Sequence, residues 1–124
     1  MRDDKTTVAE LTALVSRFVA DRDWQQFHDP KNLSASIAIE AAELMEHFQW
    51  DDYKEENAAE LESELADIII YCLYFAVSNK IDIAKAVEKK IDKISKKYQI
   101  KVFNHKKDDP KDYWRIKKNY RSRK

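Results

Sequence analysis

The amino-acid sequence predicts an all-α protein of one domain, and three observations lead to this prediction. Hydrophobic residues recur every three or four positions along most of the first 98 residues, as expected for amphipathic helices. The chain has no glycine and only two prolines, Pro30 and Pro110. Because tight β-hairpins and phosphate-binding loops need the positive φ angles of glycine, its absence argues against hairpin sheets, the P-loop and the dinucleotide fingerprint. A length of 124 residues suits a single domain.

The first predicted helix begins after Thr7, which has capping-box spacing to Glu10. Its apolar stripe runs from Val8 to Phe18 through Leu11, Leu14 and Val15. Residues 21–28 then break the helical pattern. This connection carries three rings, which is more aromatic content than a plain linker needs, and they belong to Trp24, Phe27 and His28.

Three further helices follow. The second opens with Asp29 as N-cap and Pro30 at the first helical position and runs to about Trp50. Its predicted apolar face consists of Ile37, Ala41, Leu44, Met45 and Phe48. After an acidic loop over 51–56, the third helix spans about 56–79, with its stripe at Leu61, Leu65, Ile68, Cys72 and Phe75. Asp82 caps the fourth helix, which carries Ala84, Val87, Ile91, Ile94 and Tyr98 at helical spacing.

The predicted division places a helical domain at residues 1–100 and a basic C-terminal tail at 101–124. The tail contains ten basic and three acidic residues in a chain whose formal net charge is zero. The interval from Tyr113 to Tyr120 is expected to form at most a short helix within it.

The third helix predicts self-association. From Ile68 to Val77 its surface is apolar on all sides, and such a helix has to be covered on all sides. A homo-oligomer, dimer or tetramer, is therefore expected.

The same run of ten residues is too short to span a bilayer, so no membrane partner is expected. The single Cys72 cannot form an internal disulfide, and the polar start does not read as a signal peptide, so a cytoplasmic location is expected.

Two acidic pairs mark the candidate site. Glu40 and Glu43 are three residues apart on the second helix, and Glu64 and Asp67 are three apart on the third. Residues at this spacing share one helical face, so antiparallel packing would let all four carboxylates line one cleft. Oxygen ligands suit Mg²⁺ and Mn²⁺.

Five acidic pairs in the chain have this spacing, so the alternative of carboxylates at the edge of the core, paired with lysines, stays open on the spacing alone. A di-iron centre is disfavoured because the chain lacks the Glu-x-x-His motif. His47, four residues after Glu43, is interpreted as a helix-end residue rather than a ligand.

The four acidic residues, with twenty residues between the two pairs, resemble the signature of the MazG-like, all-α nucleoside triphosphate pyrophosphohydrolases. Residues 22–33 and 43–50 also resemble the dCTP pyrophosphatase branch of that family, and the resemblance extends over roughly residues 7–98. It implies a four-helix MazG core completed by oligomerisation, with Mg²⁺ held by Glu40, Glu43, Glu64 and Asp67. It further implies a nucleobase pocket and a phosphate-binding lysine, formed by Trp24, His28, Trp50, Tyr71 and Lys90.

The resemblance implies hydrolysis at the α-phosphorus, giving a nucleoside monophosphate and pyrophosphate, with a dCTP-like preference suited to removing unwanted nucleotides. Glu43 is expected to orient or deprotonate the attacking water. The chain departs from the family pattern at Ile94, where an asparagine is usual, and at residues 97–99. Two alternatives remain. The chain could be a non-catalytic helical oligomer whose basic tail binds nucleic acid, although a nucleotide is the more expected partner. It could also be an enzyme of the same fold that acts on phosphoribosyl-ATP.

Overall fold

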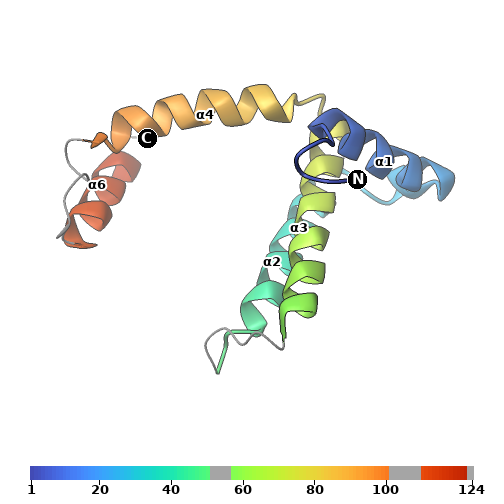
Figure 1. Cartoon of the computed structure of the whole chain (residues 1–124), viewed down its shortest axis with the longest axis horizontal. Coiled ribbons are helices and arrows are strands. Elements are labelled where there is room, and N and C mark those ends of the chain that lie inside the picture. Colours follow the sequence, from blue (N-terminus) through green and yellow to red (C-terminus); the bar gives the residue numbers. More distant parts are fainter. Residues whose placement is uncertain (51–56, 101–109, 123–124) are drawn as a thin grey trace. The chain divides into compact units, whose positions relative to one another are not determined.

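A computed structural model describes residues 1–50, 57–100 and 110–122, and in these ranges the chain forms helices and turns and no strand (Figure 1). The predicted all-α class is therefore confirmed. The elements are α1 (Val8–Asp21), the 3₁₀ turn η1 (Trp24–Gln26), α2 (Pro30–Glu46), α3 (Ala58–Ser78), α4 (Ile83–Lys97) and α6 (Pro110–Ser122). The predicted acidic loop at 51–56 lies outside the described residues.

The chain forms two compact units, Met1–Ile83 and Ala84–Lys124. The first unit contains α1, η1, α2 and α3, and the second contains α4 and α6. The domain division at residue 100 stays a prediction, whereas the contacts group α4 with the C-terminal helix.

Both N-terminal caps expected in the first unit are present. The backbone N–H of Glu10 donates to Oγ1 of Thr7 at 3.1 Å, and the N–H of Thr7 donates to the Glu10 carboxylate at 2.7 Å, which completes a capping box. Asp29 accepts from the N–H of Asn32 at 2.7 Å, and Pro30 occupies the first helical position. These bonds satisfy backbone donors that the first turn leaves free, and they fix where α1 and α2 begin.

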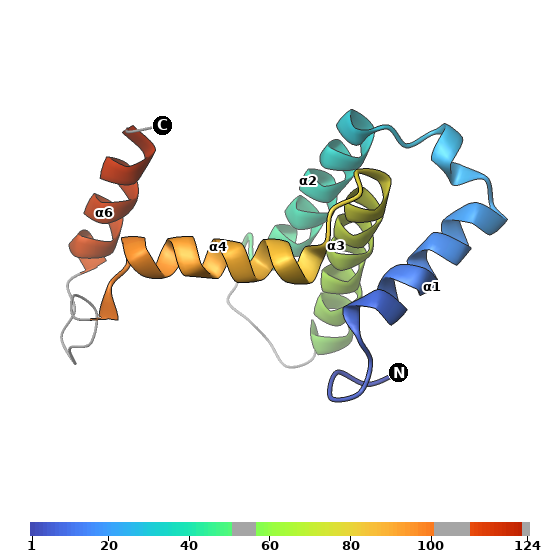
Figure 2. The ribbon, with the colours of Figure 1, turned by 90° about the horizontal axis from the view of Figure 1, so that it is seen from above.

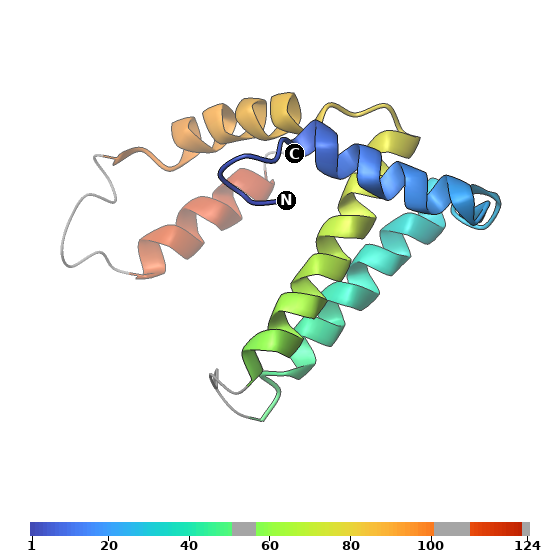
Figure 3. The ribbon, with the colours of Figure 1, turned by 45° about the vertical axis from the view of Figure 1, so that its right-hand side comes forward.

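α2 and α3 pack side by side and antiparallel, and α1 packs across the C-terminal half of α3 (Figures 1 and 3). The buried core lies where these three helices meet. It is formed by Val15, Val19, Leu33, Leu73 and Tyr74. The sequence-based apolar face of α2 omitted Leu33, which is the most deeply buried side chain described.

The predicted apolar face of α2 was wrong at its C-terminal end. Met45 is 67% exposed and Phe48 is also exposed, and the helix ends at Glu46 rather than near Trp50. The physical reason is that α1 covers only the region around the start of α2. Among the described residues, the main packing partner of α2 is α3, and Met45 and Phe48 near its C-terminal end stay open to solvent.

α3 buries only part of its apolar surface within one chain. Leu73, Tyr74 and Ala76 are buried, whereas the apolar side chains of Ile69, Ile70 and Val77 are exposed. Of the helices described, none combines the length and apolar character needed to cross a membrane.

In the second unit the short C-terminal helix is real and longer than predicted, since α6 runs from Pro110 to Ser122. Tyr98, just after α4, stacks on Tyr113 of α6, with ring centroids 5.4 Å apart and an interplanar angle of 18°. The Nζ of Lys97 lies 4.1 Å from the centre of the Tyr120 ring, a cation–π contact between the two helices.

Candidate metal centre and aromatic pocket

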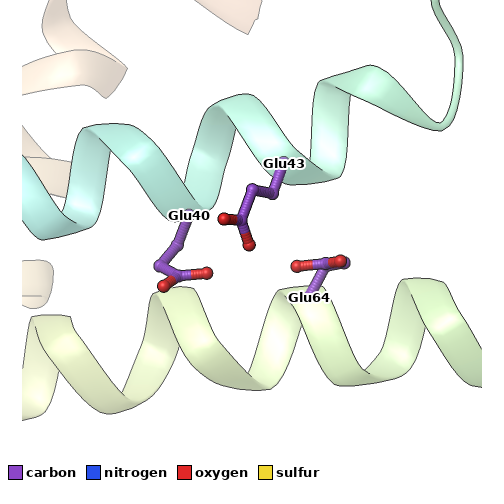
Figure 4. A group of neighbouring side chains, drawn as sticks. All are labelled: Glu40, Glu43 and Glu64. Carbon is purple, nitrogen blue, oxygen red and sulfur yellow. The ribbon is translucent and has the colours of Figure 1, made fainter.

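Three carboxylates converge between α2 and α3. Glu40 and Glu43 lie one turn apart on α2, and Glu64 lies opposite them on α3. One oxygen from each lies within 4.8 Å of the other two, and Figure 4 shows all three side chains directed into the space between the helices. The spacing of three and the antiparallel packing together produce this arrangement.

The electrostatics of this carboxylate cluster (Glu40, Glu43 and Glu64) show that it concentrates negative charge. The pKa of Glu40 is raised from 4.5 to about 6, first by burial, then by its hydrogen bond with Glu43 and that residue's charge, and then by the charges of Asp67 and Glu64. The Oε2 atom of Glu40 is buried and has no hydrogen-bond partner among the described residues. A buried oxygen without a partner is costly unless something binds it.

Asp67, the fourth predicted ligand, lies one turn beyond Glu64 on α3 and is half-buried. Among the described residues it does not join the group of three mutually close oxygens. Its charge nevertheless contributes to the raised pKa of Glu40, so it lies near the site.

The donor set fits a hard divalent cation. All three converging ligands are carboxylate oxygens, and oxygen donors suit Mg²⁺ and Mn²⁺ better than softer metals. A cation would also satisfy the buried Oε2 of Glu40 and offset the repulsion that raises its pKa. Glu40, Glu43 and Glu64 are the residues that would hold it.

His47 contacts this cluster, and the sequence analysis missed the contact. The residue caps the C-terminus of α2, as its interpretation as a helix-end residue expected. Its Nε2 lies 3.4 Å from Oε1 of Glu64, and its Nδ1 lies 3.6 Å from Oε2 of Glu60. The sequence contained one indication of this contact, because His47 follows Glu43 by four residues and therefore lies on the same side of α2 as Glu43.

A separate pocket of about 230 Å³ is lined by aromatic side chains. They are Trp24, Phe27, His28 and Tyr71. Figure 2 shows the chain passing from the end of α1 through η1 to the start of α2, the segment that supplies three of them. Phe27 was not among the predicted site residues, although its place between Trp24 and His28 in the ring-rich connection could have identified it.

Local hydrogen bonds shape the turn that carries these rings. Asp23 has a positive φ of 52°, a left-handed conformation that aspartate tolerates better than most residues. The Nε2 of Gln26 donates to the backbone oxygen of Asp23 at 3.0 Å. At the other end, Nδ2 of Asn32 donates to the backbone oxygen of Phe27 at 3.2 Å, which ties the turn to the first turn of α2.

The His28 ring lies between the pocket and the core. Its centroid is 6.3 Å from that of Tyr71 and 5.3 Å from that of Tyr74, both at steep angles. The Nδ1 atom of His28 and the hydroxyl of Tyr74 are buried without a hydrogen-bond partner in the described ranges. Burial also raises the pKa of Tyr74, so its hydroxyl keeps its proton.

Two predicted binding residues do not line this pocket. Trp50 is 86% exposed and follows the end of α2, whereas His28 precedes its start, and a helix of 17 residues is about 25 Å long. Lys90 belongs to the second unit, where it lines a groove of about 190 Å³ beside α6. That groove also contains Lys93, Ile94, Lys97, Tyr98 and Tyr120.

Comparisons with known proteins define the class of this chain. Residues 35–112 match the MazG-like family. The chain is 35% identical over 102 residues to dCTP pyrophosphatase 1 of Bos taurus, covering 76% of this chain and 60% of that protein. It is 34% identical over 100 residues to dCTP pyrophosphatase 1 of Homo sapiens, covering 74% and 59%. The chain therefore spans about 60% of the length of these curated relatives.

The structure resembles the crystal structure of a pyrophosphatase from Archaeoglobus fulgidus. The TM-score is 0.69 at 35% sequence identity, and the match covers 80% of this chain and 98% of that one. This chain belongs to the MazG-like family, and the resemblance noted in its sequence is confirmed.

Proposed function

We propose that this protein is a Mg²⁺-dependent nucleoside triphosphate pyrophosphohydrolase. It hydrolyses its substrate at the α-phosphorus and releases a nucleoside monophosphate and pyrophosphate. The observation that carries the proposal is the convergence of Glu40, Glu43 and Glu64 between α2 and α3 in a chain of the MazG-like family. Relatives and a solved structure named as pyrophosphatases support the same reaction class.

In this proposal Glu40, Glu43 and Glu64 hold the divalent cation, and Asp67 faces the same site as a further acidic ligand. When bound, Mg²⁺, or Mn²⁺ in its place, offsets the charge of the triphosphate and makes a water molecule more acidic. Glu43 orients that water and takes up its proton as the water oxygen bonds to the α-phosphorus. The bond from the α-phosphorus to the bridging oxygen breaks, and pyrophosphate leaves with the electron pair. Positioning and charge stabilisation supply most of the rate.

The aromatic pocket is proposed to bind the base. Trp24, Phe27 and Tyr71 offer ring faces, and stacking a base on an aromatic ring is worth about 1–3 kcal/mol. His28 lines the same pocket, and a histidine ring can hydrogen-bond a polar edge of the base. A preference for dCTP is proposed because the curated relatives are named dCTP pyrophosphatase 1. Lys90 is proposed to bind the outer phosphates as a point charge.

Self-association through α3 is proposed because Ile69, Ile70 and Val77 are exposed within one chain. Trp50 and the aromatic pocket lie at opposite ends of α2, so Trp50 can contact a bound base only if a second copy supplies it. Light scattering should give two or four times the chain mass of 14.7 kDa, and Ile69→Lys should lower that mass. A single-chain mass for the unaltered protein would contradict this proposal.

The reaction is tested with a panel of nucleoside triphosphates and Mg²⁺. We expect pyrophosphate and the monophosphate as products, with dCTP giving the highest initial rate. The products are separated by anion exchange, and pyrophosphate is distinguished from orthophosphate by its conversion to orthophosphate with added inorganic pyrophosphatase. Release of orthophosphate alone would refute the reaction class, and turnover of phosphoribosyl-ATP alone would favour that alternative.

The role of the aromatic pocket is tested by a variant that is assayed with the same panel of nucleoside triphosphates. Trp24→Ala should raise KM for the preferred substrate by about 5- to 150-fold, the range that corresponds to one stacked base. The kcat should change less, because the ring binds ground state and transition state alike. Phe18→Leu is the matched control, since Phe18 contacts Trp24 edge-on at 5.2 Å but does not line the pocket.

A further inference from the structure

His47 connects two glutamates of α3 from the end of α2. Glu60 and Glu64 are four residues apart and therefore occupy one face of α3. The His47 ring lies between them, with Nε2 3.4 Å from Glu64 and Nδ1 3.6 Å from Glu60. Only 20% of the His47 side chain is exposed, so the ring is held in place rather than free in solvent.

Glu64 is the carboxylate for which this contact matters. It is the only member of the carboxylate cluster that comes from α3, so its orientation decides whether the two helices present oxygens to one point. Its side chain is 23% exposed and has three rotatable bonds. A ring N–H that donates to Oε1 restricts these rotations, while the carboxylate keeps free lone pairs for a cation.

We propose that His47 is a positioning residue that fixes the Glu64 carboxylate for the divalent cation held by Glu40, Glu43 and Glu64. The inference rests on the proposed function, because it requires that this cluster binds a cation. Hydrogen-bond partners of metal ligands orient those ligands, and their loss typically costs about 10- to 100-fold in metal affinity. His47 acts in this way on Glu64 from the capping position of α2.

Glu60 lies on the other side of the ring. Its carboxylate is 69% exposed, so its contact with Nδ1 is screened by solvent and contributes less than the contact on Glu64. The two ring nitrogens face two different carboxylates, and the ring is not part of the group of three converging ligands. His47 is therefore a partner of a ligand and not a ligand itself.

The test measures binding of Mn²⁺ alone to the full chain by isothermal titration calorimetry, without nucleotide. His47→Leu should raise the Mn²⁺ dissociation constant by about 10-fold. His47→Gln should stay close to the unaltered protein, because its amide nitrogen lies near the position of Nε2 and can donate to Glu64. His47→Asn should resemble the leucine variant, since its shorter amide corresponds to Nδ1. Glu62→Gln, which removes an exposed charge from the same helix, is the control and should change little.

Equal Mn²⁺ affinity for the leucine, asparagine and unaltered proteins overturns the positioning role and leaves the metal centre standing. If the unaltered protein itself binds no Mn²⁺, the metal centre of the proposed function fails, and the role of His47 fails with it. If the leucine variant does not fold, the Mn²⁺ affinities of the glutamine and asparagine variants are compared instead. Both side chains are polar, but the glutamine amide nitrogen replaces Nε2 and the asparagine amide nitrogen replaces Nδ1. Equal affinities for those two variants overturn the proposal.

Discussion

Replacing Glu43 by glutamine is expected to abolish turnover of nucleoside triphosphates while the helices stay folded. Glutamine has nearly the same size but carries no charge and cannot accept the proton of the attacking water. Loss of a positioned general base typically costs about 10²- to 10⁴-fold in rate, and loss of a metal ligand adds to that. The measurement is kcat for pyrophosphate release, with circular dichroism to verify helix content.

The fold should tolerate this change well. Glu43 raises the pKa of Glu40 through a hydrogen bond and its charge, so removing its charge relieves repulsion in the metal-free protein. The melting temperature without metal should therefore stay level or rise. Glu62→Gln on α3 is the matched control and should keep full activity. A Glu43→Gln variant that retains most of its turnover would remove Glu43 from the catalytic role.

Removing divalent cations is expected to have the second large effect. A chelator should abolish activity, and adding back Mg²⁺ or Mn²⁺ should restore it, because the triphosphate and the carboxylates otherwise repel each other. Activity that persists after exhaustive chelation would contradict the metal centre. The same cations should raise the melting temperature, since a ligand that binds only the folded state stabilises it.

The pH dependence of stability gives a second measurement on the metal-free protein. Folding raises the pKa of Glu40 from 4.5 to about 6, so the folded protein binds the proton more tightly than the unfolded chain does. The contribution of Glu40 to the free energy of unfolding is thus greatest below pH 4.5 and is lost as the pH rises through about 6. We expect the melting temperature to fall by roughly 2–4 °C over this interval after allowance for solvent screening.

Two controls make this pH effect specific. Glu40→Gln cannot titrate at this position, so the fall in melting temperature between pH 4.5 and 6.5 should be smaller in that variant. Saturating Mg²⁺ should also reduce it at the upper end of the interval, because the cation replaces the proton there. An identical pH profile for the variant and the unaltered protein would show that Glu40 is not the group responsible.

The helices and the carboxylate cluster were predictable because they depend on short-range patterns. Capping at Thr7 and Asp29 defines the starts of α1 and α2, and a spacing of three places Glu40 beside Glu43. The burial of Leu33 was not predictable in this way. It depends on how α1 meets α2 and α3, which involves residues far apart in the chain.

The same reasoning explains the missed contact of His47. The residue lies 17 positions before Glu64, and only the antiparallel packing of α2 on α3 brings the two side chains together. The end of α2 was misplaced because Phe48 continues the apolar pattern after the helix has ended at Glu46. For Trp50, the motif predicts a role in binding the base but does not indicate that the residue lies at the opposite end of α2 from the aromatic pocket.

Helix α2 fixes the distance between the rings that precede it in the aromatic pocket and the glutamates Glu40 and Glu43 of the proposed site. The aromatic pocket begins just before Pro30, and Glu40 lies ten residues further along the helix, a rise of about 15 Å. A regular helix neither stretches nor shortens readily, so in the proposed site this interval would set the distance between a bound base and its phosphates. Inserting one alanine after Ser36 would lengthen it by only about 1.5 Å but would rotate Glu40 and Glu43 by about 100° away from α3. In the proposed site, the carboxylates would then no longer point toward the phosphates of a nucleotide whose base occupies the pocket. Selection of a ligand by the distance from base to phosphate would thus depend on the number of residues in α2.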